Sequence, residues 1–176
     1  MDGSLIHKVG PLSELVIERI HRCAAFAAES FAKEFAIPQG GTHQGGCLCV
    51  MDGEGDVQLD AIVGKVDSEH KARFHDNAYS KCKGLLIRKD DPSCVSSWFF
   101  RDTRAQPPLY GGGIELFNGS FMAFSGFPEA VDEAFCIAIA YKHHLLNEEL
   151  EARIVRASGN AALAARAKEF VRRARS

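Results

Sequence analysis

Three consecutive glycines in a predicted strand are the first residues of this chain suited to contact a ligand. Tyr110 precedes the triplet, and Gly112 and Gly113 end it. Glycines in a strand cost conformational entropy and add no packing, so they indicate close approach by a ligand or by another backbone. The alternative is a bulge beside an aromatic side chain that needs the room. We expect Tyr110, Gly112 and Gly113 to lie at a binding site.

A serine-glycine loop further along the chain leads into an acidic helix start. Ser125 and Gly126 come before Pro128, which suits the first position of a helix. Free backbone amides at a helix start bind carboxylates or phosphates. Glu129 and Asp132 follow at once, and they favour a neutral or cationic ligand group over a bare phosphate. The simpler alternative is that these acids only cap the helix.

A predicted helix that begins near Asp67 carries further polar candidates. His70 and His75 lie five positions apart, about 140° around the helix axis, so they cannot chelate one ion together. Either alone could be an axial haem ligand, an acid–base group or a surface histidine. Lys81 could reach a ligand carboxylate or form a salt bridge inside the domain. His43, in a glycine-rich loop, is an equally open candidate.

The sequence carries no signature of nucleophilic catalysis or of nucleotide binding. Gly-x-Ser-x-Gly, Walker and Rossmann fingerprints are absent. The six cysteines lie mostly in apolar stretches, which indicates buried thiols rather than disulfides. Cys47 and Cys49 share one face of a predicted strand. No second Cys or His pair has a matching spacing, so we expect no metal site.

Size and charge limit the classes of partner. A chain of 176 residues suits one domain with a substantial core. The formal net charge of −2 gives no general attraction to nucleic acid or to anionic membranes. No apolar run approaches the roughly 20 residues that span a bilayer, and the first residues do not form a secretory signal. We expect a cytoplasmic protein without a membrane or nucleic-acid partner.

These candidates must be positioned by alternating helices and hairpins. Apolar residues at helical spacing predict a long helix from near Ser13 to before Pro38. Residues 47–51 are apolar throughout, which indicates a strand covered on both faces. The Asn-Gly pair at 118–119 predicts a type I′ hairpin turn. The predicted order is helix, two strands, helix, a short helix after Pro92, two or three strands, and helix. The fold class is therefore α+β, an antiparallel sheet with helices packed on both faces.

The end of the chain forms a predicted C-terminal helical extension. Residues 1–147 make up the predicted domain, and residues 148–176 are basic and rich in alanine. An apolar stripe runs along the extension through Leu163, Ala167, Phe170, Val171 and Ala174. Such a stripe commonly packs on a neighbouring subunit and leaves the arginines in water. Contact of the arginines with nucleic acid is the alternative.

Several local motifs resemble those of the GlcG/HbpS-like family, whose members are often called haem-degrading domains. Residues 50–55 resemble the family's strand that ends in an acidic, glycine-containing turn, and residues 79–82 its helix with a lysine before a small residue. Residues 111–114 and 125–133 resemble its glycine-rich strand, serine-glycine loop and acidic helix start, which is the most specific part. The likeness covers about residues 12–141. Its departures are a cysteine after the lysine, a phenylalanine before the proline, a compact hairpin and the basic tail.

This resemblance implies a profilin-like fold, a homo-oligomer, and a site for a small organic ligand, with haem as one candidate. An enzyme is the second hypothesis: a histidine with Asp132 or Glu129 would act as a general acid–base pair on a small carbonyl or hydroxy acid. A scaffold for protein association is the third, with the tail supplying an apolar surface. The predicted ligand-binding residues are His70, Lys81, Tyr110, Gly112, Gly113, Ser125, Gly126, Glu129 and Asp132.

Overall fold

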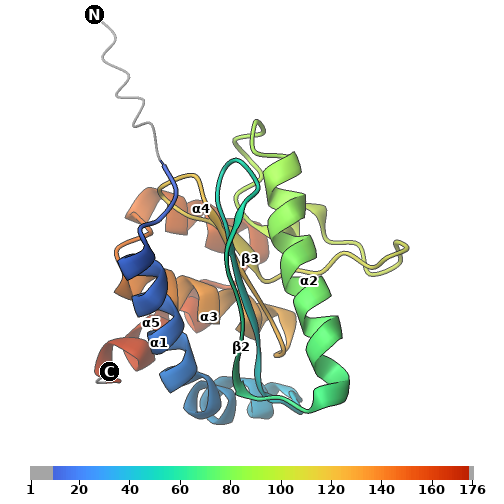
Figure 1. Cartoon of the computed structure of the whole chain (residues 1–176), viewed down its shortest axis with the longest axis vertical. Coiled ribbons are helices and arrows are strands. Elements are labelled where there is room, and N and C mark those ends of the chain that lie inside the picture. The colour runs from blue at the N-terminus through green and yellow to red at the C-terminus, as the bar shows by residue number, and fades with distance from the viewer. Residues whose placement is uncertain (1–9, 175–176) are drawn as a thin grey trace, which may run out of the picture.

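The computed structural model describes residues 10–174, which form a mixed α+β fold around one four-stranded antiparallel sheet (Figure 1). The strand order is β2-β1-β4-β3. In chain order the helices and strands are α1 (Glu14–Phe31), β1 (Gln44–Met51), β2 (Val57–Lys65), α2 (Ser68–Ile87), β3 (Gly113–Glu115), β4 (Phe121–Ser125), α3 (Glu129–Lys142), α4 (Glu148–Ser158) and α5 (Ala161–Arg173).

Helices cover both faces of the sheet, as predicted. In Figure 1 α2 stands on one side of the strands, and α1 and α3 stand on the other. The position of β1 between two layers of helices explains why its sequence is apolar throughout. Leu48 packs in the core beneath α1 and α3, while Cys47 and Cys49 pack beneath α2. Every residue of β1 after Gln44 is buried. The prediction of a strand covered on both faces is confirmed.

The first helix leads to the end of the sheet at which the central strand β1 begins. It starts after Ser13, whose hydroxyl accepts a hydrogen bond from the Val16 amide at 3.4 Å. It continues through a π-helical turn (Ala32–Ala36) and a 3₁₀ turn (Ile37–Gln39). Gly40 ends this run with a φ of 82°. The predicted start and end of the helix are confirmed, and the loop that follows presents His43.

The predicted short helix after Pro92 forms only in part, as a 3₁₀ turn that carries Trp98 and Phe99 but not Cys94 or Val95. The Asp91 carboxylate instead accepts hydrogen bonds from the amide and the hydroxyl of Ser93, at 2.9 and 2.6 Å, which favours a local turn over a helix. Ser96 then forms an isolated bridge to Ile114 of β3. A 3₁₀ turn (Ser97–Phe100) follows only after that bridge. The segment therefore extends the sheet edge rather than covering it.

The second hairpin turns at residues 118–119, but not as a type I′ turn. Gly119 has a φ of 75°, whereas Asn118 does not reach positive φ. The Asn118 side chain instead accepts from the Ser120 amide at 3.3 Å and donates to its hydroxyl at 2.9 Å. Leu116 and Ser120 close the loop through a backbone hydrogen bond of 2.8 Å. The turn position was predicted correctly and its type was not.

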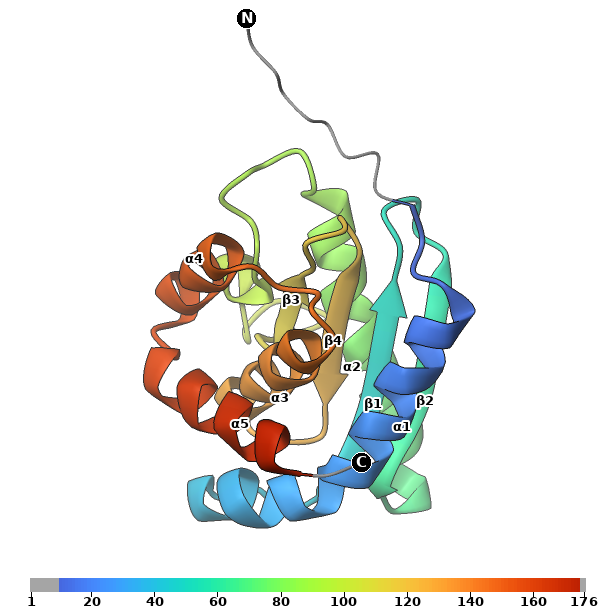
Figure 2. The same cartoon turned by 90° about the vertical axis from the view of Figure 1, so that its left-hand side faces the viewer.

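The C-terminal extension consists of two helices: α5 packs on α3, and α4 packs on α5 and on the 3₁₀ turn Ser97–Phe100 (Figure 2). Gly159, with a φ of 71°, ends α4 before α5 begins. The apolar stripe packs inside the chain, with Ala167 and Val171 in the same core as Phe31. The expectation that this stripe covers a neighbouring subunit is therefore wrong, because α3 and α1 of the same chain bury it. Within residues 10–174 no helix is both long and apolar enough to cross a membrane.

Candidate functional site

A cavity of about 590 Å³ lies beside the two central strands, at the end of the sheet where β1 begins and β4 ends. Four segments enclose it: the loop before β1, residues 73–81 of α2, the segment 101–110, and the loop from β4 into α3. Its volume is in the range of small-molecule sites. It is lined by Gly40, Gly41, Thr42, His43, Arg73, Phe74, Asn77, Lys81, Arg101, Thr103, Tyr110, Ser125, Gly126, Phe127, Pro128, Glu129 and Asp132.

A buried ion pair between Lys81 of α2 and Asp132 of α3 forms the floor of the cavity. The ammonium lies 2.8 Å from Asp132 Oδ2, and both side chains are 3% exposed. Lys81 Nζ also donates to the Phe124 carbonyl at 2.5 Å, and Asp132 Oδ1 accepts from the Phe127 amide at 2.9 Å. Burial raises the pKa of Asp132 to about 7, and the Lys81 cation opposes that rise. Lys81 thus has the intradomain salt bridge that was the alternative to ligand contact.

The glycine triplet makes room for protein groups. A Cβ at Gly112, where φ is 104°, would lie 2.6 Å from Asp132 Cβ and 2.9 Å from Lys81 Nζ. A Cβ at Gly111 would lie 2.6 Å from the Trp98 ring, which is the aromatic neighbour of the alternative interpretation. Gly113 is buried, and its amide donates to the Ser97 hydroxyl at 2.8 Å. The absence of side chains at Gly112 and Gly113 therefore leaves the space in which Lys81 and Asp132 pack at the floor of the cavity.

Glu129 fastens the segment 101–110 to the start of α3. Its carboxylate accepts two hydrogen bonds from Arg101 Nε, at 3.0 and 2.8 Å, and one from the Gly111 amide at 2.8 Å. The Arg101 guanidinium also lies 5.2 Å from the centre of the Trp98 ring. One wall of the cavity is thus held by a carboxylate that is already paired. The N-cap of α3 is Pro128, which has no side-chain capping bond, so the simple helix-capping alternative is not what these acids do; Asp132 accepts instead from the Phe127 amide before the helix.

The charges that line the cavity do not cancel. Lys81 is paired with Asp132 and Arg101 with Glu129, whereas Arg73 makes no ion pair among residues 10–174. The Arg73 guanidinium lies 5.4 Å from the Phe74 ring centre and is exposed at the cavity. The sequence predicts a neutral or cationic ligand group near these acids, because carboxylates oppose an anion. With both acids paired, the excess charge of the lining is positive.

The structure brings most of the predicted site residues together. Lys81, Tyr110, Ser125, Gly126, Glu129 and Asp132 all line the cavity, and Gly112 and Gly113 lie directly behind it. His70 is not in the lining but contacts His43, which is. Sequence reasoning missed Arg73, Asn77, Arg101, Thr42 and Thr103. Arg73 and Asn77 precede Lys81 at intervals of four, so one face of the helix carried a signal that could have found them.

Histidines occur in two groups that could hold a metal. His43, Asp67 and His70 form one group, and Cys47, Asp60 and His75 form the other. Burial lowers the pKa of His43, and the neighbouring His70 and Arg73 lower it further. The six cysteines are free and buried, which confirms the prediction of unpaired thiols.

Comparison of this chain with protein-family models, with curated proteins and with solved structures finds no match in any of the three.

Proposed function

We propose that this protein binds a small organic molecule through a carboxylate group in the cavity beside Arg73. The observation that carries the proposal is the lone guanidinium: every other full charge in the lining has an internal partner. An arginine binds a carboxylate through two parallel hydrogen bonds, which a paired arginine cannot offer. The side chain of Asn77, one turn further along α2, adds a donor and an acceptor for the rest of the ligand.

The proposal includes the wider assignment that the motifs imply. We infer a GlcG/HbpS-like domain with a profilin-like arrangement, and a homo-oligomer in solution. Hairpin-linked strands between helices support the first inference. Light scattering on the full chain tests the second: a monomer mass at all concentrations would contradict it.

Calorimetric titration with paired probes tests the binding proposal. Acetate, succinate and benzoate are compared with the corresponding neutral amides, so that only the carboxylate differs. We expect heat from at least one acid and none from its amide. Arg73→Gln should weaken that binding by about 10- to 100-fold, the usual effect of losing charge-assisted hydrogen bonds. Lys71→Gln removes an exposed positive charge outside the cavity on the same helix and should leave the affinity unchanged.

Haem is the second ligand to be tested, because His43 offers an imidazole in the cavity lining. The lining also contains many polar side chains around Phe74 and Phe127, which suits a small polar molecule better than a porphyrin face. Titration with haemin distinguishes the two. A Soret shift that His43→Ala abolishes would support the haem version, and an unshifted spectrum would remove it.

An enzyme is a second candidate function, favoured by Asp132. A carboxyl group whose pKa is raised to about 7 in a cavity suits general acid–base catalysis near neutral pH. Glu129 is less suited to that role because Arg101 and the Gly111 amide already occupy its oxygens. Any turnover found on a small carbonyl or hydroxy acid should fall sharply in Asp132→Asn. Full activity in that variant would exclude the role.

A further inference from the structure

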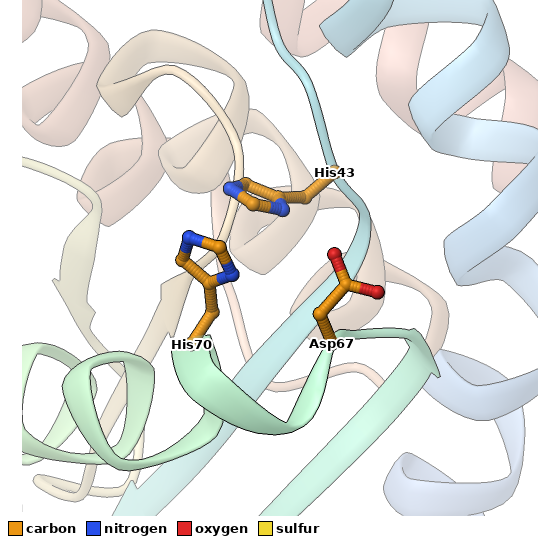
Figure 3. Close-up of side chains that lie close together, drawn as sticks. All are labelled: His43, Asp67 and His70. Atoms are coloured by element: carbon orange, nitrogen blue, oxygen red, sulfur yellow. The ribbon is translucent and has the colours of Figure 1, made fainter.

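Three side chains with metal-binding atoms converge beside the cavity (Figure 3). His43 comes from the loop before β1, and Asp67 and His70 come from the start of α2. Figure 3 shows the two imidazole rings and the carboxylate turned toward one another. One potential ligand atom of each residue lies within 4.8 Å of the others, and the two ring centres are 4.6 Å apart. Distant segments therefore supply two nitrogens and an oxygen to one small region.

These groups lack the protein partners that their positions would otherwise provide. Asp67 occupies the N-cap position of α2, yet its carboxylate accepts no capping hydrogen bond. Aspartate at an N-cap usually makes that bond, so its absence frees the carboxylate for another role. Among residues 10–174, His70 Nδ1 is buried without a hydrogen-bond partner, and the Glu69 Oε1 oxygen lies 3.6 Å away. Buried polar atoms are nearly always satisfied, so this nitrogen indicates a ligand.

The second group shows what a satisfied cluster looks like. Asp60 Oδ1 accepts from the Cys47 thiol at 3.0 Å and lies 2.5 Å from His75 Nδ1. Cys47 Sγ and His75 Nδ1 are 3.3 Å apart. These three residues are already hydrogen-bonded to one another. The contrast singles out the cluster of His43, Asp67 and His70.

We propose that His43, Asp67 and His70 bind one divalent transition-metal ion through two imidazole nitrogens and one carboxylate oxygen. Imidazole ligands suit zinc, iron, cobalt and nickel rather than magnesium or calcium. Three protein ligands leave coordination positions open, and because His43 lines the cavity those positions face it. Bonds of about 2.0–2.2 Å require the ligand atoms to move closer by up to about 1.5 Å. The loop that carries His43 follows Gly40 and Gly41, so it can make that adjustment.

The spacing of these residues explains why no metal site was predicted. His70 and His75 share a helix but not a face. The histidine that does contact His70 is His43, which lies far away in the sequence, before β1. The metal site and the carboxylate site depend on different residues. The metal proposal therefore stands or falls without regard to Arg73.

Titration of the full chain with zinc chloride and with cobalt chloride tests the proposal. Calorimetry should show one zinc ion per chain, and cobalt should give visible absorption bands without a thiolate charge-transfer band. His43→Ala, Asp67→Asn and His70→Ala should each weaken zinc binding by at least about 100-fold, since losses of supporting residues alone reach 10- to 100-fold. Asp67→Asn keeps a residue that can cap α2, so this variant folds even where a histidine variant does not.

Cys47→Ser and His75→Ala serve as matched controls from the second cluster, and both should bind zinc as the native protein does. Far-UV circular dichroism verifies the fold of each variant. The proposal is overturned if the native chain gives no binding heat and no cobalt bands. It is equally overturned if Asp67→Asn binds zinc normally, or if the controls lose binding and cobalt shows a thiolate band, which would place the ion at Cys47.

Discussion

Replacing Lys81 by methionine should destabilise the protein in a way that depends strongly on pH. Lys81→Met removes a buried cation 2.8 Å from Asp132 and leaves a carboxyl group that is 3% exposed. The cation is the strongest of the influences that lower the pKa of Asp132, so this pKa rises further from its native value of about 7. Removal of one member of a buried ion pair commonly costs about 3–5 kcal/mol. Here part of that cost must follow the ionisation of Asp132.

The sign of the pH effect follows from proton binding. A carboxyl group with a raised folded-state pKa binds more protons when folded, so stability falls as pH rises from its unfolded pKa to its folded pKa. In the native protein this decline ends near pH 7, where Asp132 ionises. In the variant it continues to higher pH. The two proteins therefore diverge above pH 7 by about 1.4 kcal/mol per pH unit, or about 2 kcal/mol between pH 7 and pH 8.5.

Urea unfolding followed by far-UV circular dichroism, under reducing conditions at pH 6 and pH 8.5, measures this divergence. The loss of unfolding free energy should be about 2 kcal/mol greater at the higher pH. The double variant Lys81→Met, Asp132→Asn lacks the titrating group but keeps an oxygen for the Phe127 amide. The native protein itself loses about 1.4 kcal/mol between pH 6 and pH 8.5 as Asp132 ionises, so the loss in the double variant, relative to the native protein, should be about 1.4 kcal/mol smaller at pH 8.5. An equal loss in Lys81→Met itself would refute the claim that burial sets the pKa of Asp132.

Three other perturbations address the packing around the site. Gly112→Ala should lower the free energy of unfolding in urea by at least about 2 kcal/mol, because the left-handed backbone is strained and the new Cβ meets Asp132. Gly119→Ala has the same backbone strain but open space around the new Cβ, so it should cost only about 1 kcal/mol. Equal losses in the two variants would contradict the clash at Gly112. Glu129→Gln should loosen the segment held through Arg101 and speed its cleavage by trypsin, with global unfolding unchanged; unaltered cleavage would show that the contact does not restrain it. The native thiols should react slowly with a maleimide and quickly in urea, since all six are buried; fast native labelling would show that the sheet opens.

Periodic patterns made most of the fold predictable. The long first helix and the strand at 47–51 follow from spacing and from unbroken apolar character, and both are confirmed. Side-chain hydrogen bonds explain the errors. The Asp91 side chain stabilises a local turn where Pro92 predicted the start of a helix. The Asn118 side chain stabilises a hairpin turn that is not the predicted type I′. Such bonds leave no periodic trace in a sequence.

The cavity was only partly predictable, because pairing between distant residues decides which groups face a ligand. Glycines and acids at 110–133 mark the place correctly, since they line or support the cavity. Their roles differ from the expectation. Gly112 leaves space for Asp132, and Asp132 and Glu129 form ion pairs with Lys81 and Arg101 respectively. No spacing rule connects Lys81 with Asp132, because the pair forms only once α2 and α3 meet across the sheet.

Chemistry in this site should therefore reside in the groups that internal pairing leaves over. The acids of α3 pair with two cations, whereas Arg73 on α2 has no acidic partner within the part of the chain that the structure describes. At the start of the same helix, Asp67 makes no capping bond, and the buried Nδ1 of His70 has no hydrogen-bond partner among the described residues. A protein that optimised only its stability would pair or remove these groups, because an unsatisfied polar atom costs free energy. Their concentration in the first half of α2, opposite His43, makes that half the part of the molecule most directly committed to a ligand.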